Sequence, residues 1–302
     1  MKQELSILIP VYNDDSTRLA AELSRQAEAI TDLSYEIIVA DDCSPCHETI
    51  VANRAVNALP HCRFIERQQN GGSAANRNFL ARESRYEWLL YIDCDLDIPV
   101  DHFLQRYLET AAEADVTMGG IAIGGEATQL MGNLRYLYEK QSEPHHTATA
   151  RRQRPYQSFR SCNFMIRRQV MLDCPFDERF QKSGYEDVLL GKQLKAAHAV
   201  IQHVDNPVLM TRYEENADYI NKVERSLRTL HSFRSELRGY SRLLTLADGI
   251  HLTIVRRLIG CLFRLLKPVV RRQLCSPHPC LRLFNPYRLG YFINYSLNTK
   301  TT

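Results

Sequence analysis

The sequence of 302 residues has no uncharged apolar run that approaches the roughly 20 residues needed to span a bilayer. It begins MKQELSILIP, without the long apolar segment and small-residue cleavage site of a secretory signal peptide. Its nine cysteines are odd in number and scattered, which is not the pattern of a disulfide framework. We therefore expect a cytoplasmic protein rather than an integral membrane protein or a secreted disulfide scaffold.

Acidic residues are missing from the end of the chain. None follows Asp248, whereas nine basic residues do: Arg256, Arg257, Arg264, Lys267, Arg271, Arg272, Arg282, Arg288 and Lys300. Residues 211–302 contain sixteen Lys or Arg and six Asp or Glu, a net charge of +10, so with +3 overall the preceding residues carry −7. We expect one large domain with an appendage, and different partners for the two regions.

The first third of the chain alternates apolar, β-branched runs with helical stretches. The predicted strands span residues 5–12, 35–40, 62–66 and 87–93. The predicted helices span about 16–30, 48–59 and 73–84. The strands are apolar throughout, as in a sheet that is covered on both faces. This alternation predicts an α/β fold with a parallel sheet and crossover helices.

The pattern continues with a predicted helix at about 100–114 and a predicted strand at 115–123. Residues 126–160 are polar and rich in arginine, and we expect a long excursion over the sheet that carries either acceptor specificity or no function. A strand-like run, SCNFMI, and a helix that begins near Glu186 follow. From Asn216 to the end the sequence predicts helices.

Three of the predicted strands end in segments that carry acids or amides. The first ends in Pro10, Tyr12 and Asn13, the second in Asp41 and Asp42, and the fourth in Asp93, Asp95 and Asp97. In open parallel sheets, ligands bind at the carboxyl ends of the strands. Asp93 and Asp95 would repel each other unless a cation lies nearby, and Mg²⁺ or Mn²⁺ beside a diphosphate is the usual arrangement. The alternative is that these acids only cap turns and the segment near Pro99.

Five segments resemble, in order and approximate spacing, the family 2 glycosyltransferases with the GT-A fold. They are SILIPVYN, EIIVADDCS, NGGSAANRN, LLYIDCDLDIP and FQKSGYEDVLLGKQL, between about residues 4 and 205. The resemblance implies a Rossmann-like, mostly parallel sheet flanked by helices, with a helical C-terminal extension. It implies a catalytic domain at 1–215, divided into a nucleotide-binding half at 1–98 and an acceptor-binding half at 99–215, and a basic helical extension at 216–302.

The resemblance also implies which residues bind a nucleotide-sugar donor. They are Pro10, Tyr12, Asn13, Asp41, Asp42, Gly72, Arg77 and Asp93. Tyr12 would stack on the base, and Asp41 or Asp42 would accept a hydrogen bond from it. Gly72 opens a helix whose N-terminus favours phosphate, and Arg77 would reach an oxygen of the diphosphate or the sugar. Without the resemblance, two adjacent glycines before a helix indicate only a turn.

Metal, base and acceptor roles follow from the same resemblance. Asp95 and Asp93 match the metal-binding acids of the family, which implies Mg²⁺ or Mn²⁺ as the cofactor, whereas the role of Asp97 stays open. Asp187 resembles the catalytic base of inverting members, which takes a proton from the acceptor hydroxyl. Asn163 and Glu186 are the predicted acceptor-binding residues. For Glu186 the alternative is an acid that the helix dipole favours at a helix N-terminus.

The sequence departs from the family at one position. Many members carry a metal-binding His after the last core strand, where this chain has Met210, a soft thioether that suits neither Mg²⁺ nor Mn²⁺. His203 is one candidate replacement, but a single His in a strand is more often structural. Water could also complete the metal shell.

The C-terminal segment 249–274 mixes apolar residues with paired arginines and contains no acid. It predicts a basic amphipathic helix, and residues 249–302 would lie on an anionic membrane surface. The alternative is a helical hairpin packed on the catalytic domain with its arginines solvated. Nucleic acid is not an expected partner, because the N-terminal region is acidic and contains no nucleic-acid-binding motif.

Together these patterns predict a metal-dependent, inverting glycosyltransferase. Its expected partners are a nucleotide-sugar donor, most simply a UDP-sugar, and a saccharide or glycolipid acceptor for cell-surface polysaccharide or glycolipid biosynthesis. We expect a cytoplasmic protein that is peripheral on the inner face of the cell membrane. Two alternatives remain at this point: a nucleotide-sugar-binding protein without turnover, and a transferase that acts on a polyprenyl phosphate.

Overall fold

The computed structural model describes residues 2–110, 113–181 and 184–299. The chain divides into two compact units. Unit 1 is Met1–Gly124 with Pro144–Arg212, and unit 2 is Gly125–Glu143 with Tyr213–Thr302. The segment 125–143 thus groups with the C-terminal helices, although it lies within the predicted catalytic domain 1–215. The boundary at residue 215 remains a prediction.

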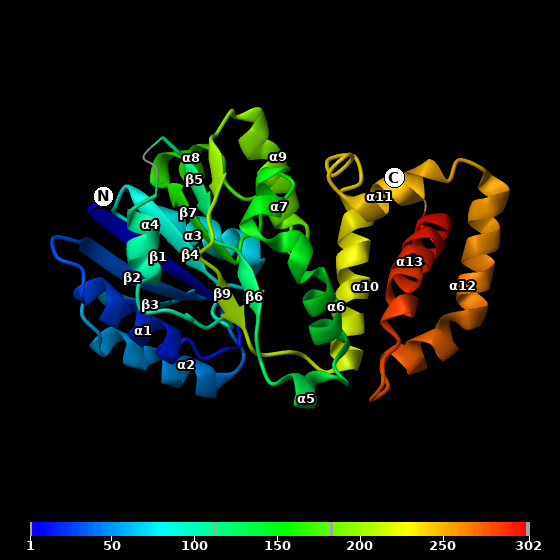
Figure 1. Cartoon of the computed structure of the whole chain (residues 1–302), viewed down its shortest axis with the longest axis horizontal. Helices are drawn as coiled ribbons and strands as arrows, with labels where there is room; N and C mark the ends of the chain where they lie inside the picture. Colours follow the sequence, from blue (N-terminus) through cyan, green and yellow to red (C-terminus); the bar gives the residue numbers. More distant parts are fainter. Residues whose placement is uncertain (1, 111–112, 182–183, 300–302) are drawn as a thin grey trace. The chain divides into compact units, whose positions relative to one another are not determined.

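Unit 1 is built on a mixed sheet with the strand order β3-β2-β1-β4-β7-β5-β8 (Figure 1). The strands are β1 Glu4–Val11, β2 Ser34–Asp41, β3 Cys62–Glu66, β4 Trp88–Ile92, β5 Val116–Met118, β7 Asn163–Arg167 and β8 Ile201–His203. β7 runs antiparallel to both of its neighbours, and the other neighbouring pairs are parallel. The predicted α/β class with a mostly parallel sheet is therefore confirmed.

The central strands form the core because their residues are apolar on both faces. β2 is buried at every position after Ser34, and β4 is buried throughout. Trp88, the only tryptophan of the sequence, begins β4 with the Lys2 ammonium 4.6 Å and the Arg167 guanidinium 4.4 Å from its ring centroid. This strand places the acidic segment 93–97 at the carboxyl edge of the sheet.

The predicted strand at 115–123 is two strands. β5 ends at Met118, and β6 Ile121–Ile123 pairs with β9 Val208–Met210 in a separate two-stranded parallel sheet. The chain turns between them at Gly119 and Gly120, and Gly120 has a φ of +93°. A side chain at Gly120 would collide with the Arg151 guanidinium, so the turn requires glycine.

The helices of unit 1 lie along the sheet. They are α1 Thr17–Glu28, α2 His47–Asn53, α3 Gly72–Glu83, α4 Phe103–Leu108, α7 Ala148–Arg152, α8 Arg168–Asp173 and α9 Glu186–Ala196, with a 3₁₀ turn at Arg54–Ala58. Another 3₁₀ turn, Glu143–His146, lies at the boundary between the two units. The predicted helix 48–59 therefore ends at Asn53 as an α-helix. The predicted helix 100–114 is only six residues long, because its buried residues end at Leu108, and residues 111–112 lie outside the described chain.

The predicted excursion 126–160 is largely helical. It contains α5 Ala127–Leu130, α6 Leu134–Ser142 and α7. Leu134 and Tyr136 of α6 are buried, and so is Arg151 of α7. The polar composition had suggested a surface loop, whereas these buried positions turn the segment into packed helices.

Unit 2 consists of α5 and α6 with the C-terminal helices, which confirms the predicted helical extension. The C-terminal elements are α10 Asn216–Ser232, α11 Arg242–Gly249, α12 Thr253–Leu274, a 3₁₀ turn at Leu281–Leu283, and α13 Phe284–Asn298. Figure 1 shows α10, α13 and α12 side by side. Within the described residues, no helix has both the length and the apolar character needed to cross a membrane.

Candidate active site

The loop after β1 lies at the carboxyl edge of the sheet. Pro10 is half-buried in β1, and Tyr12 is 50% exposed just beyond it. Asn13 has a φ of +54°, donates its N–H to the Ser44 hydroxyl at 2.7 Å and accepts the Cys46 N–H at 3.2 Å. Asn13 therefore holds the loop after β2, and Tyr12 presents an open ring to a ligand.

The carboxylate of Asp41 is occupied by a turn. Asp41 is 1% exposed and accepts the Ser44 N–H at 2.8 Å and the Ser44 hydroxyl. Its backbone carbonyl accepts the Arg67 N–H at 3.0 Å. These bonds fix the end of β2. The carboxylate of Asp41 therefore stabilises the turn after β2.

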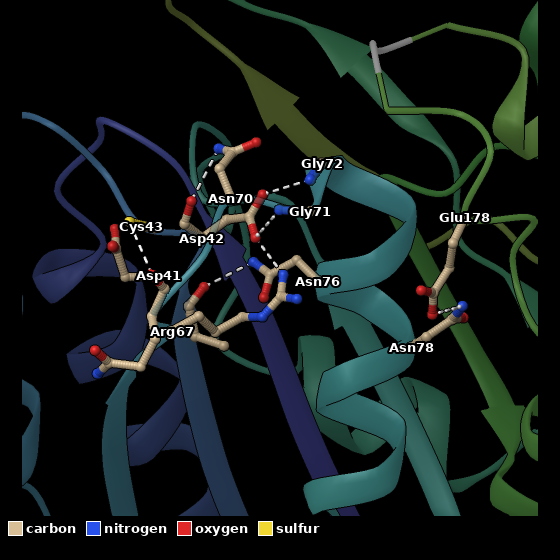
Figure 2. A network of polar contacts seen from close by, with 12 residues as sticks. Asp41, Asp42, Cys43, Arg67, Asn70, Gly71, Gly72, Asn76, Asn78 and Glu178 are labelled. Carbon is tan, nitrogen blue, oxygen red and sulfur yellow. Dashed lines mark hydrogen bonds and ion pairs between the residues drawn. The ribbon is translucent and has the colours of Figure 1, made fainter.

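Asp42 anchors the start of α3 (Figure 2). Its carboxylate accepts the Gly71 N–H at 3.1 Å and the Gly72 N–H at 2.7 Å, and it pairs with the Arg67 guanidinium. Burial raises the pKa of Asp42, whereas these two N–H groups and Arg67 lower it. The first N–H groups of α3, which the sequence assigned to phosphate, thus bind an acid of the protein.

Gly72 is required by its surroundings. Its φ is +83°, and a side chain there would approach the Gln181 carbonyl oxygen to 2.6 Å. Only glycine therefore brings the start of α3 against the segment that precedes α9. The position of Gly72 serves this close approach, and its predicted role in donor binding remains open.

Arg77 is buried at the centre of the acidic residues. Its Nη2 donates to Asp93 Oδ1 at 2.6 Å, its Nη1 donates to the Ser73 hydroxyl, and Nη1 lies 3.9 Å from Glu186 Oε1. Burial lowers the pKa of Arg77, but Asp93 and Glu186 outweigh it and the net shift is upward. Arg77 therefore joins the end of β4 to the start of α9 through charge.

Asp93 and Asp95 fit a hard divalent cation by their chemistry. Burial raises the pKa of Asp93, Arg77 lowers it, and the neighbouring charge of Asp95 raises it again. Mg²⁺ typically takes one or two carboxylates, with phosphate oxygens and water completing the shell. In the described ranges, no cluster of three or more His, Cys, Asp or Glu side chains forms a metal site. The two acids therefore suit a cation that a bound diphosphate also holds.

Asp97 and His203 are used internally. Asp97 accepts the Thr211 hydroxyl at 2.6 Å, and its backbone pairs with Leu209 in β9 through two hydrogen bonds. His203 Nδ1 accepts from Arg151 Nε at 3.2 Å, and its Nε2 lies 3.0 Å from the Pro155 carbonyl oxygen. Burial lowers the pKa of His203 to about 4. His203 is thus a neutral structural side chain, which favours the structural alternative over a metal ligand.

Asp187 lies in the first turn of α9 and is half-buried. The pKa of Asp187 is raised to about 6: burial and the charge of Glu186 raise it, and Arg160, the Val188 N–H and Arg77 lower it by less. Glu186 itself is buried and accepts the Gly184 N–H at 2.8 Å and the Ser73 hydroxyl at 3.4 Å. Asp187 therefore carries a carboxylate of raised pKa that interacts with the charges of Glu186 and Arg77, a property that suits a general base.

Asn163, a predicted acceptor-binding residue, lies inside the core. It is 0% exposed, and its side-chain oxygen accepts the Tyr107 hydroxyl at 2.6 Å. Its amide nitrogen donates to the Gly120 carbonyl at 2.8 Å and the Asn206 carbonyl at 3.0 Å. Asn163 thus ties β7 to the glycine turn after β5, and its position gives no support to contact with an acceptor.

Two arginines at the carboxyl edge of the sheet were not predicted from the sequence as site residues. Arg67 has no local signal, because its partner Asp42 lies 25 residues away. Arg212 follows β9, donates to Asp14 Oδ1 at 2.7 Å and to the Cys94 carbonyl at 3.0 Å, and interacts electrostatically with Asp95. Arg212 could have been predicted as a site residue, because it follows Met210 by two residues and the predicted metal-binding acids are expected at the same edge of the sheet.

The mixed sheet, with acids at the ends of β2 and β4 and an open aromatic ring after β1, defines a Rossmann-like protein of the GT-A class. The chain belongs to glycosyl transferase family 2, whose family profile matches residues 6–174, more than half of the sequence. The resemblance stated from the motifs is therefore confirmed.

Curated relatives match limited stretches of the chain. An uncharacterised glycosyltransferase of Haemophilus influenzae is 36% identical over 93 residues, 30% of this chain and 29% of the relative. A poly(ribitol-phosphate) β-glucosyltransferase of Bacillus spizizenii is 30% identical over 118 residues, 38% of this chain and 19% of the relative. An Escherichia coli chondroitin synthase is 34% identical over 113 residues, 37% of this chain and 16% of the relative. The chain thus spans less than a third of the length of each.

Solved structures share the fold at lower identity. A mannosyltransferase from Pyrobaculum calidifontis, solved with GDP-Man and Mn²⁺, is 13% identical with a TM-score of 0.56 over 98% of this chain and 88% of that one. Residues 1–349 of S. aureus TarS, solved with UDP-GlcNAc, are 18% identical with a TM-score of 0.50 over 97% and 91%. At these identities the likeness establishes the GT-A fold alone.

Proposed function

We propose that the chain transfers a sugar from a nucleoside diphosphate sugar, in the first instance a UDP-sugar, to a hydroxyl of a saccharide or glycolipid acceptor, with inversion. The names of two relatives, a poly(ribitol-phosphate) β-glucosyltransferase and a chondroitin synthase, favour a role in polysaccharide biosynthesis. The neighbours solved with UDP-GlcNAc and with GDP-Man favour a nucleotide-sugar donor.

The observation that carries this proposal is the state of Asp187. A carboxyl with a pKa of about 6 is ionised at neutral pH and is still a useful proton acceptor. As the acceptor oxygen forms its bond to the anomeric carbon, the bond from that carbon to the diphosphate breaks and Asp187 takes the hydroxyl proton. A single displacement of this kind inverts the configuration.

Arg77 acts in this scheme as a positioning residue. Asp93, Ser73 and Glu186 contact its two terminal nitrogens, and the side chain is only 4% exposed, so little of the guanidinium is accessible to a ligand. It would therefore fix the donor-side acid Asp93 at a set place relative to the segment that carries Asp187. This role differs from the direct contact with the diphosphate that the sequence suggested.

Asp95 and Asp93 would hold Mg²⁺ or Mn²⁺. Such an ion supplies positive charge to the leaving diphosphate. Arg212 would add a second cation on the same edge, where it already contacts Asp14 and the Cys94 carbonyl. This places a charged side chain beside the position where the family often has a His and this chain has Met210. Tyr12, Asn13 and the backbone around them would receive the base and ribose.

The test measures donor binding. UDP-sugars and GDP-sugars are screened by thermal shift with Mn²⁺ and with EDTA, because a ligand of the folded state raises the melting temperature. We expect stabilisation by one nucleotide-sugar class and a dependence on the cation. If no nucleotide sugar or nucleoside diphosphate stabilises the protein under either condition, the proposal is wrong.

A further inference from the structure

Helix α12 has two distinct faces. Its inner face packs against α13: Gly260 lies against Leu297, and Phe263 lies against Gly290. Its outer face carries an apolar stripe with exposed fractions from 57% to 73%. The members of this outer stripe are Ile254, Leu258, Leu262, Leu265 and Val269. Their spacing of three or four residues places them along one line of the helix.

The cations of α12 also divide into two groups. Lys267 and Arg271 turn inward and pair with Glu224 of α10 at 3.1 and 3.2 Å. Arg256 donates to the Ala247 carbonyl at 3.0 Å. These three residues are therefore committed to the fold of unit 2, although the sequence had counted them with the surface charge.

The second group borders the outer stripe. Arg257 and Arg264 are exposed and seven residues apart, so they lie two turns apart along one side of the stripe. Arg272 is exposed at the C-terminal end of the helix. Within the described part of the chain none of the three has an ion-pair partner, and no acidic residue occurs in α12.

We propose that the outer stripe of α12, with Arg257, Arg264 and Arg272, docks on the surface of an anionic lipid bilayer. The apolar side chains would enter the boundary between headgroups and acyl chains, and the arginines would bind the anionic headgroups. The helix then lies in the plane of the interface, consistent with its lack of a spanning apolar segment. This inference is independent of the proposed reaction.

Charge decides between a bilayer and a second copy of the chain. Two α12 helices packed stripe to stripe would bring rows of arginine near each other without any acid on the helix to pair with them. An anionic bilayer offers the opposite charge. The expected gain is about fivefold in partition coefficient for each arginine held at the surface.

The first experiment measures flotation of the full chain with phosphatidylcholine vesicles, with and without phosphatidylglycerol. The variant Arg257→Gln/Arg264→Gln/Arg272→Gln should lose about 10²-fold in partitioning onto the anionic vesicles. The control is Arg18→Gln/Arg154→Gln/Lys195→Gln, which removes the same charge from exposed residues of unit 1. The control should float like the native protein. Equal loss by the two variants, or no binding of the native chain, would overturn the proposal.

The second experiment places the stripe in the membrane. In Leu262→Trp the new indole should be quenched by brominated lipid in anionic vesicles, whereas the native Trp88, which is 4% exposed, should not. The variant Leu258→Ser/Leu265→Ser should reduce vesicle binding and keep the native melting temperature.

Two other occupants give different results. A dimer in sedimentation velocity that Leu258→Ser/Leu265→Ser dissociates, without vesicle binding by the native chain, would assign the stripe to a second copy. A marked fall in melting temperature for the same variant would assign it to packing within the chain. Either result contradicts docking on a bilayer.

Discussion

The acids at the ends of β2 and β4 are alike in sequence and different in their surroundings. Asp41 and Asp42 are almost completely buried and receive hydrogen bonds from Ser44, Gly71 and Gly72. Asp93 is half-buried and is bound by Arg77 on one oxygen, and its neighbour Asp95 is half-buried as well. A carboxylate whose oxygens accept hydrogen bonds from the protein (a filled acid) stabilises the fold. A carboxylate with an oxygen that no protein donor occupies (an open acid) can bind a ligand.

The largest effect is expected from Asp187→Asn, which removes the predicted base in the first turn of α9. Turnover should fall by about 10² or more, the usual scale for losing a positioned base, with little change in donor affinity. The raised pKa of Asp187 means that its ionised form costs stability. This cost begins to shrink as the pH falls below about 6 and is fully lost only below 3.8, the pKa of an unperturbed Asp. The variant should therefore be at least as stable as the native protein at neutral pH. If Asp187→Asn keeps native turnover on the true acceptor, another residue is the base.

The second prediction concerns the filled acids. Asp42→Asn should lower the free energy of unfolding by about 2 kcal/mol. Arg67 and the two glycine N–H groups lose a charged acceptor, and this loss outweighs the gain from no longer burying the charge, which raises the pKa of Asp42. Urea denaturation measures this change. Donor affinity of the folded fraction should be nearly native. Unchanged stability together with lost donor affinity would instead make Asp42 a ligand of the base.

Asp95→Asn should have the opposite profile. It removes a charge that the cation requires and keeps the shape of the side chain, so nucleoside diphosphate affinity in Mn²⁺ should fall about tenfold, or about 1.4 kcal/mol. Stability should change little because Asp95 is half-buried. Calorimetry in EDTA is the control, and equal affinity of the native protein in EDTA and in Mn²⁺ would remove the metal from the proposal.

The pH dependence of kcat/KM tests the assignment of the base in the native protein. Asp187 acts when it is deprotonated, and its pKa is raised to about 6, so kcat/KM should fall as the pH falls through about 6. The loss should approach tenfold for each pH unit below that value. A profile that stays flat down to pH 5 would indicate a base with an ordinary carboxyl pKa.

The smallest effect is expected from Arg212→Gln. Losing a half-exposed cation beside a diphosphate should raise KM about fivefold, or about 1 kcal/mol, with kcat less affected. Arg154→Gln removes an exposed arginine elsewhere in unit 1 and serves as the control. Equal KM values for the two variants would mean that Arg212 does not contact the donor and serves only its contacts to Asp14 and the Cys94 carbonyl.

The sequence predicted elements that depend on local pattern. β1, β2, β3 and β4 are near their expected ranges because each is a short apolar run that ends in a polar turn. The 115–123 run was predicted as one strand because it is apolar throughout. Its two halves differ only in their partners, since β5 pairs with β7 and β8 whereas β6 pairs with β9. A local pattern does not contain such partners.

The same limit explains the candidate site. The acids were found because they lie at the ends of apolar strands. Ser44, which donates to Asp41, is three residues away, but other partners of the site residues lie far away in sequence. Arg67 is 25 residues from Asp42, and Arg151 is 52 residues from His203. Asn163 has an amide side chain of the kind that binds ligands, but its hydrogen bonds are made to other residues of the core. Distinguishing filled from open acids therefore required the structure.

The single tryptophan gives the molecule a natural optical probe. Trp88 lies in the sheet of unit 1, and unit 2 contains no tryptophan, so indole emission reports the melting of the first unit alone. Circular dichroism at the helical minimum responds to both units, and strongly to the helices of the second. Recorded on one sample, the two signals reveal whether the protein unfolds as one cooperative block or in two steps, before any label is added.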